Sequence, residues 1–106
     1  MKLRTHHRNG IINNLPDYMV EGLIRYIEDG ILPGSFLHAI LRNDLQDACA
    51  CADNTNRCLI WEYVNVLWNY SPSDCWGSPE KVQRWVEARE HERKGGTSEA
   101  HTEALL

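Results

Sequence analysis

Residues 58–70, CLIWEYVNVLWNY, decide how this chain folds. At helical spacing, one face of the segment is almost wholly apolar: Leu59, Tyr63, Val66, Leu67 and Tyr70. A second stripe carries Ile60, Val64 and Trp68. Because a helix that is apolar on two sides is normally surrounded by other helices, we expect this one to lie at the centre of the domain.

A β-strand is the alternative for this segment, which is rich in β-branched and aromatic residues. A half-buried strand alternates strictly between apolar and polar positions. That alternation fails at Leu59, Ile60 and Trp61, which are three consecutive apolar residues. The pattern therefore favours a helix.

Helix signals also occur before this segment. A Pro near the first position and a Gly at the end predict a helix over about 16–29, closed by Gly30. Ser35 is a suitable N-cap for the next helix. Asn43-Asp44 interrupts that helix, so we expect it to be bent, or split with Asp44 as a second cap.

The last helix has the clearest start, with Ser78 as cap and Pro79 at the first position. We therefore predict a compact all-α domain of four helices, the second bent or split, over residues 15–94. A flexible basic lead-in over 1–14 and a disordered tail over 95–106 are expected to flank it.

Charge is unevenly distributed along the 106 residues, whose formal net charge is −4. The first ten residues carry Lys2, Arg4 and Arg8 and no acid, whereas residues 11–79 carry nine acids against three arginines. An acidic body argues against broad binding of a phosphate backbone, which needs a basic surface. The basic N-terminal residues alone offer a contact for an anionic partner.

Neither a membrane span nor a secretory signal is expected. No run of 18 apolar residues exists, and no apolar segment follows the basic N-terminal residues. The expected compartment is therefore the cytoplasm, and no membrane is expected among the partners.

The four cysteines do not follow a structural zinc pattern, since their spacing is C-x-C-x6-C-x16-C. On a helix, Cys49 and Cys51 would point about 200° apart and diverge from any shared metal. A two-disulfide framework is disfavoured because the chain lacks secretory features. We expect Cys49, Cys51, Cys58 and Cys75 to be reduced and to act as small hydrophobes.

No group of residues in the sequence has the pattern of a catalytic or cofactor site. We therefore expect that the protein is not an enzyme and that it binds neither a cofactor nor a metal. His38 is expected to be a partly buried packing residue, and nothing singles out a Cys75–His38 nucleophile pair. Asp44 and Asp47 can share a helical face, but they lack a third ligand, so a solvated face is the simpler interpretation.

The two turns before helices carry the remaining candidates. Each could seat an anion at a helix N-terminus, but both lack the Lys and glycine spacing of a phosphate loop. Trp76 lies in a polar loop and is the tryptophan most suited to an interface, whereas the others are assigned to the core. The candidate interaction surface comprises Pro33, Gly34, Ser35, Trp76, Gly77 and Ser78.

Several motifs occur together between Leu15 and Trp85: RYIEDGI at 25–31, PGSFL at 33–37, NDL at 43–45 and CWGSPEKV at 75–82. This combination resembles a family of small phage and prophage proteins. The resemblance implies an accessory gene working inside a bacterium. Because the family has no established activity, the resemblance assigns no functional residue.

Two functions remain open. The favoured one is a non-enzymatic accessory protein that binds another protein, for example a host or defence factor. The alternative is a nucleic-acid or nucleotide binder that uses the basic N-terminal residues and the helix starts at Ser35 and Ser78. The sequence leaves the oligomeric state undecided, and a homodimer is one outcome.

Overall fold

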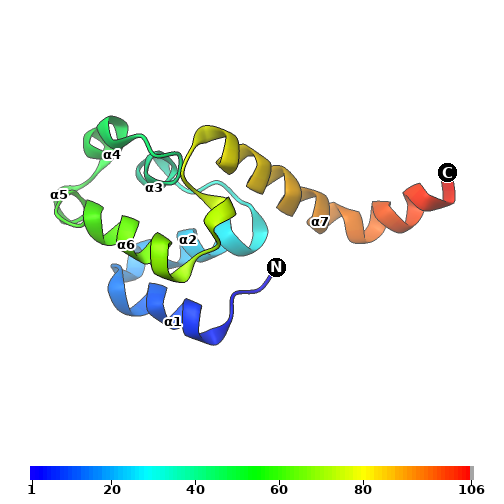
Figure 1. The fold of residues 1–106 in the computed structure, drawn as a ribbon, viewed down its shortest axis with the longest axis horizontal. Helices are drawn as coiled ribbons and strands as arrows, with labels where there is room; N and C mark the ends of the chain where they lie inside the picture. The colour runs from blue at the N-terminus through cyan, green and yellow to red at the C-terminus, as the bar shows by residue number, and fades with distance from the viewer. Residues whose placement is uncertain (106) are drawn as a thin grey trace.

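In the computed structural model, the deciding segment forms helix α6 (Ile60–Tyr70), which confirms the helical interpretation. The structure describes the backbone of residues 1–105 and the side chains of residues 1–94, and this part contains no strand. Figure 1 shows the other elements: α1 (Thr5–Asn14), α2 (Asp17–Asp29), α3 (Ser35–Leu41), α4 (Leu45–Cys51), α5 (Asn54–Arg57), the 3₁₀ turn η1 (Ser73–Cys75) and α7 (Pro79–Leu105).

The all-α class is confirmed, but the count of four helices is too low. The predicted second helix is split into α3 and α4, as expected. At the split, Asn43 adopts φ 65°, and the Asp44 carboxylate caps α4 by accepting from Asp47 N at 3.0 Å. Helices α1 and α5 were not predicted. The latter is a single turn, capped by Asp53, which accepts from Asn56 N at 2.7 Å.

Residues 1–14 differ from the expected flexible lead-in, because most of them form α1, which packs on α6 and α2. Ile11 is fully buried. Gly10 lies so close to the Tyr70 ring that an added Cβ would overlap it. Although glycine often marks a turn, Gly10 permits a close helix contact here. The expected disordered tail over 95–106 lies outside the residues whose side chains are described, and stays a prediction.

Helix α2 contributes several fully buried residues to the described core. Its residues Leu23, Tyr26 and Ile27 are fully buried, and it packs against both α1 and α7. The Tyr26 hydroxyl donates to the backbone carbonyl of Cys75 at 2.6 Å, which ties η1 to the core. Since a buried hydroxyl needs a partner, this bond fixes the position of the loop before α7.

The central position that we expected for α6 is wrong. Its Tyr63, Val66 and Leu67 are buried, but its other face is open to solvent. Trp61 is 66% exposed and Trp68 77% exposed. Within the described residues, Val64 and Trp68 of the second stripe stay exposed, whereas Ile60 packs partly against the core.

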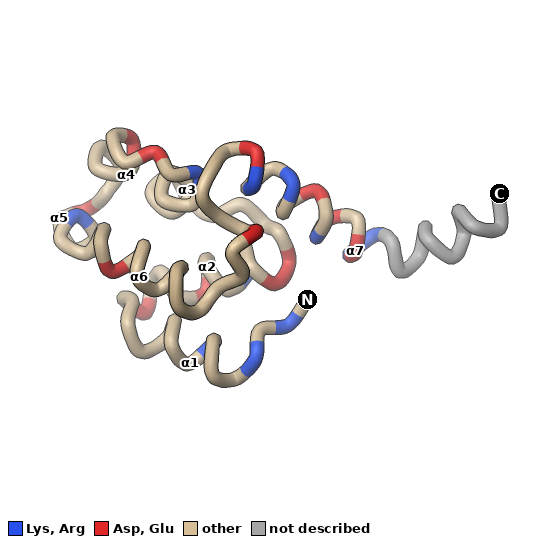
Figure 2. Tube along the Cα trace, viewed as in Figure 1, with Lys and Arg blue, Asp and Glu red and all other residues tan. Residues whose placement is uncertain are grey.

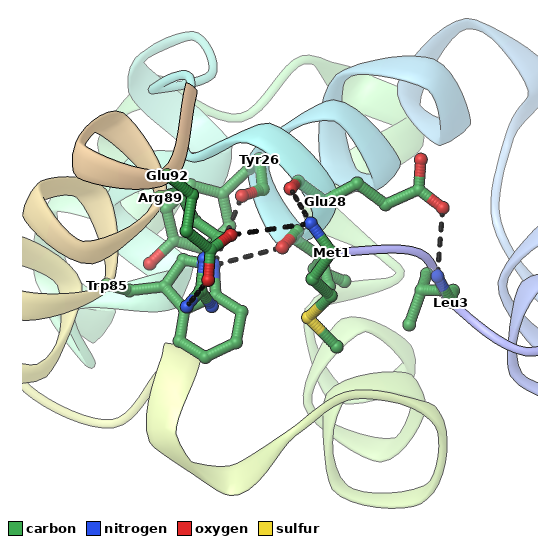
Figure 3. Close-up of polar contacts among 8 residues, drawn as sticks. Met1, Leu3, Tyr26, Glu28, Trp85, Arg89 and Glu92 are labelled. Carbon is green, nitrogen blue, oxygen red and sulfur yellow. Dashed lines mark hydrogen bonds and ion pairs between the residues drawn. The ribbon is translucent and has the colours of Figure 1, made fainter. Parts of the chain in front are cut away.

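The C-terminal end of α2 meets α7 at a tight junction, shown in Figure 3. Gly30 ends α2 in the left-handed conformation (φ 72°), as expected, and its N–H donates to Tyr26 O at 2.8 Å. The Trp85 indole Nε1 donates to Tyr26 O at 3.2 Å and to Ile27 O at 3.1 Å. Tyr26 O thus accepts two bonds, while the bond to Ile27 O satisfies a carbonyl that the helix end leaves without a backbone partner. The Arg89 guanidinium lies 4.2 Å from the centroid of the Trp85 ring.

A buried carboxylate holds the first residues against this junction. Glu28 is only 8% exposed, and its Oε2 accepts from Leu3 N at 3.0 Å and from Arg8 Nη1 at 3.2 Å. The Met1 amino group donates to the Glu28 backbone carbonyl at 3.0 Å (Figure 3). Because removal of one partner would leave a buried charge unpaired, these contacts stabilise the position of α1.

Among the described residues, none of the helices combines the length and the apolar character needed to traverse a bilayer.

Candidate interaction surface

A groove of about 500 Å³ runs between α3 and α7. We call it the α3–α7 groove. It is lined by Leu32, His38, Arg42, Pro79, Val82, Gln83, Val86 and Glu87. Four of these residues are apolar and four are polar or charged, which is the composition of a binding groove rather than of a core cavity.

The two predicted turns lie beside the ends of this groove. The turn Pro33–Ser35 directly follows the groove residue Leu32, and Ser78 directly precedes the groove residue Pro79. Gly77 N donates to the backbone carbonyl of Leu41 at 2.7 Å, which holds the start of α7 at the end of α3. The turns therefore frame the groove, but their own residues do not line it.

The two predicted caps have different outcomes. The Ser78 hydroxyl accepts from Lys81 N at 3.2 Å, which confirms the cap of α7. Ser35 is not a cap, because the N-cap of α3 is Gly34 and no side chain bonds to the helix start. The extended backbone of Gly34 brings the chain into α3 one residue earlier than expected.

Trp76 lies outside the groove. It is half-buried and packs edge-to-face on Trp68, with 6.5 Å between the ring centroids. Beside the two rings is a depression of about 340 Å³, lined also by Ser71, Ser73, Gly77 and Lys81. The assignment of the other tryptophans to the core is wrong for Trp61 and Trp68, which are more exposed than Trp76.

The sequence carries a signal that this part of α6 faces solvent. Asn65 and Asn69 are interleaved with Trp61, Val64 and Trp68 on the same part of α6. Amide side chains seldom face a dry core without partners. Both amides are exposed in the structure, and Asn69 Nδ2 donates to Asn65 O at 2.9 Å.

The polar wall of the groove carries a histidine and an arginine. Burial lowers the pKa of His38, and the nearby Arg42 guanidinium lowers it further. The imidazole is therefore neutral at pH 7 and can donate or accept a hydrogen bond. Arg42 forms ion pairs with Asp47 and, at 3.5 Å, with Asp44, so the two carboxylates of α4 neutralise this end of the groove.

The cysteines do not converge. Cys75 is fully buried in η1, whereas Cys49 and Cys51 on α4 and Cys58 after α5 are exposed. Burial raises the pKa of the Cys75 thiol to about 11, which is the opposite of an activated nucleophile. Cys75 thus packs as the expected small hydrophobe, while the other three do not. No group of three or more metal-binding side chains gathers within the described part of the chain.

Comparison with protein-family models, with curated proteins and with solved structures gives no match to this chain. The resemblance to small phage and prophage proteins stays a hypothesis that rests on the sequence motifs.

Proposed function

We propose that this chain is a non-enzymatic protein that binds a partner protein through the α3–α7 groove. The observation that carries the proposal is the apolar groove itself, with Leu32 47% exposed at its rim. The lining also carries the Glu87 carboxylate, whereas the charge of Arg42 is paired with Asp44 and Asp47. A partner segment with apolar anchor residues fits such a groove, and the Glu87 charge at its edge gives orientation.

We place this activity in a phage or prophage setting, as an accessory protein that binds and modulates a host or defence protein in the bacterial cytoplasm. The support is the set of motifs between residues 25 and 82 that resembles small phage proteins. The acidic net charge of −4 suits a protein partner better than a nucleic acid.

Replacement of Leu32 by Asp is expected to reduce partner recovery about tenfold or more, because loss of one buried anchor typically costs over 1 kcal/mol of binding energy. The tagged full chain is expressed in bacteria, and captured proteins are quantified by mass spectrometry. Ile31→Asp is the matched control, since Ile31 is 40% exposed but does not line the groove. Equal recovery with all three chains, or no protein above background, would contradict the proposal.

A second candidate function has one specific observation in its favour. Lys2, Arg4 and His7 surround a depression of about 230 Å³ whose lining also includes Tyr70. Proteins that bind single-stranded nucleic acids combine cationic side chains, which contact phosphates, with aromatic rings on which bases stack. Arg8, expected to contribute, is engaged instead with Glu28.

For this second candidate, combined Lys2→Gln and Arg4→Gln substitutions are expected to weaken the binding of a fluorescent single-stranded oligonucleotide at low salt. Loss of two phosphate contacts should also reduce the slope of log K against log salt by roughly 1.4. Fluorescence anisotropy over a salt series measures both effects, with exposed Arg84→Gln as the control. Binding that is insensitive to salt, or absent from the unmodified chain, would eliminate this function.

A further inference from the structure

The outer face of α6 is a second, separate feature that the groove does not use. We call it the α6 stripe, and it comprises Trp61, Val64, Asn65 and Trp68. Trp61 is 66% exposed, Val64 42% and Trp68 77%. None of these residues lines the α3–α7 groove. Contiguous apolar patches of this kind on a small domain usually mark an interaction site.

The stripe is symmetric along the helix. Trp61 and Trp68 are seven residues apart, which is about two turns, so their side chains lie on one face. Their midpoint falls between Val64 and Asn65. A two-fold axis through this midpoint would set Trp61 of one copy beside Trp68 of a second, antiparallel copy, and would make the same contact twice. A face of this kind is complementary to itself, as an isologous interface requires.

Charge also favours a second copy at this position. The net charge of −4 opposes self-association, but α6 contains a single charged residue, Glu62, which is half-buried. Arg57 ends α5 just before α6, and Asp74 lies in η1 after it. In Figure 2, α6 itself is mostly tan, the colour of uncharged residues. In an antiparallel pair, each Arg57 approaches the end of the second copy that carries Asp74.

The exposed apolar area is large enough to anchor such a pair. With about 200 to 250 Å² for a tryptophan, the exposed parts of Trp61, Val64 and Trp68 amount to roughly 400 Å² per copy. That is about half of the surface that each partner buries in a standard interface. Flanking residues such as Asn65 and Asn69 supply polar area around this apolar centre.

We propose that a second copy of this chain covers the α6 stripe, in an antiparallel two-fold pair centred between Val64 and Asn65. The pair goes beyond the proposed function, because it uses a different surface and leaves both α3–α7 grooves open. It also explains why an acidic protein exposes two tryptophans on one face of α6.

Sedimentation velocity of the full chain over a range of concentrations tests the pair. The unmodified chain is expected to sediment as a dimer, and combined Trp61→Ala and Trp68→Ala substitutions should weaken dimerisation at least a hundredfold. Leu45→Ala is the matched control, since Leu45 is 65% exposed but lies on α4. A monomer at all concentrations up to about 0.1 mM, or a double variant that still dimerises, overturns the pair. Partner capture through Leu32 would be unaffected by either result.

Disulfide trapping tests the position of the axis. In a chain whose exposed cysteines are replaced by serine, Asn65→Cys is expected to form covalent dimers readily. The two copies of residue 65 are offset by only about 1.5 Å along the helix axis, whereas those of residue 69 are offset by roughly 13 Å. A disulfide requires Cα atoms within about 7 Å, so Asn69→Cys should react far more slowly. Equal rates, or faster reaction of Asn69→Cys, would refute the antiparallel arrangement. The serine replacements are at Cys49, Cys51 and Cys58.

Discussion

Replacement of Trp85 by alanine is expected to lower the free energy of unfolding by about 3 to 5 kcal/mol. The indole is 9% exposed, so the substitution leaves a large cavity between α2 and α7. It also removes the donor to Tyr26 O and Ile27 O, and the ring beneath the Arg89 guanidinium. Since small domains have a total stability of about 5 to 15 kcal/mol, this one change removes a large share.

Urea denaturation followed by far-ultraviolet circular dichroism measures the effect without relying on tryptophan fluorescence. Trp85→Phe helps to separate the two causes, because it keeps most of the apolar volume while it loses the Nε1 bonds and a small part of the ring system. It should cost about 1 to 2 kcal/mol. Leu45→Ala, at a residue 65% exposed, should change stability by less than about 0.5 kcal/mol. A Trp85→Ala variant as stable as the Leu45→Ala variant would show that α7 does not depend on this contact.

The features that the sequence predicted well are those set by short-range chemistry. The left-handed Gly30 after α2, the Ser78 cap of α7 and the Asp44 cap of α4 each depend on a few neighbouring residues. Such signals identify where a helix starts or stops without reference to the rest of the fold. For the same reason they placed the split between α3 and α4 correctly.

The features that were missed depend on what the rest of the chain covers. Gly10 signals a turn in isolation, yet in the fold it allows α1 to pack closely on Tyr70. The outer face of α6 signals burial in isolation, yet Trp61 and Trp68 are exposed among the described residues. Periodicity shows which residues share a face, but it does not show whether a second element is available to cover that face.

The α3–α7 groove could be predicted only in part. Its walls come from residues 32–42 and 79–87, and their pairing is a long-range contact that no local pattern specifies. The two turns were identified because glycine, proline and serine mark them. They lie beside the ends of the groove. Residues such as Leu32, Val82 and Gln83, which line it, carry no sequence pattern that marks a binding site.

The junction of Gly30 and Trp85 connects stability with the proposed function. It fixes α7 against α2, while the bond from Gly77 N to Leu41 O fixes the start of α7 against α3. Together they set the width of the α3–α7 groove. A substitution that moves α7 should therefore weaken partner binding even when it lies outside the groove, so partner-binding variants must be shown to fold normally.

Replacement of Gly30 by alanine is expected to cost about 2 to 4 kcal/mol of stability, because two effects add. With φ at 72°, a residue with a Cβ is strained in the left-handed conformation. The new Cβ would also overlap Arg89 Cβ and lie 3.3 Å from Val86 O. Arg89 Cβ is bonded directly to the α7 backbone and Val86 O is part of that backbone. Neither atom can therefore move away unless α7 itself shifts.

Two other glycines separate strain from overlap in the same urea experiment. Gly77 has φ 121°, and an added Cβ meets nothing closer than Lys81 Cδ at 3.6 Å, so Gly77→Ala tests strain alone. Gly34 has φ −65° and nothing within 4 Å, so Gly34→Ala should change stability by less than about 1 kcal/mol, because the gain from a less flexible unfolded chain is offset by the poorer N-cap of α3. The expected order of destabilisation is Gly30, then Gly77, then Gly34. If Gly30→Ala cost no more than Gly77→Ala, the close contact between Gly30 and Arg89 would carry no energy, and α7 would be free to move away from α2.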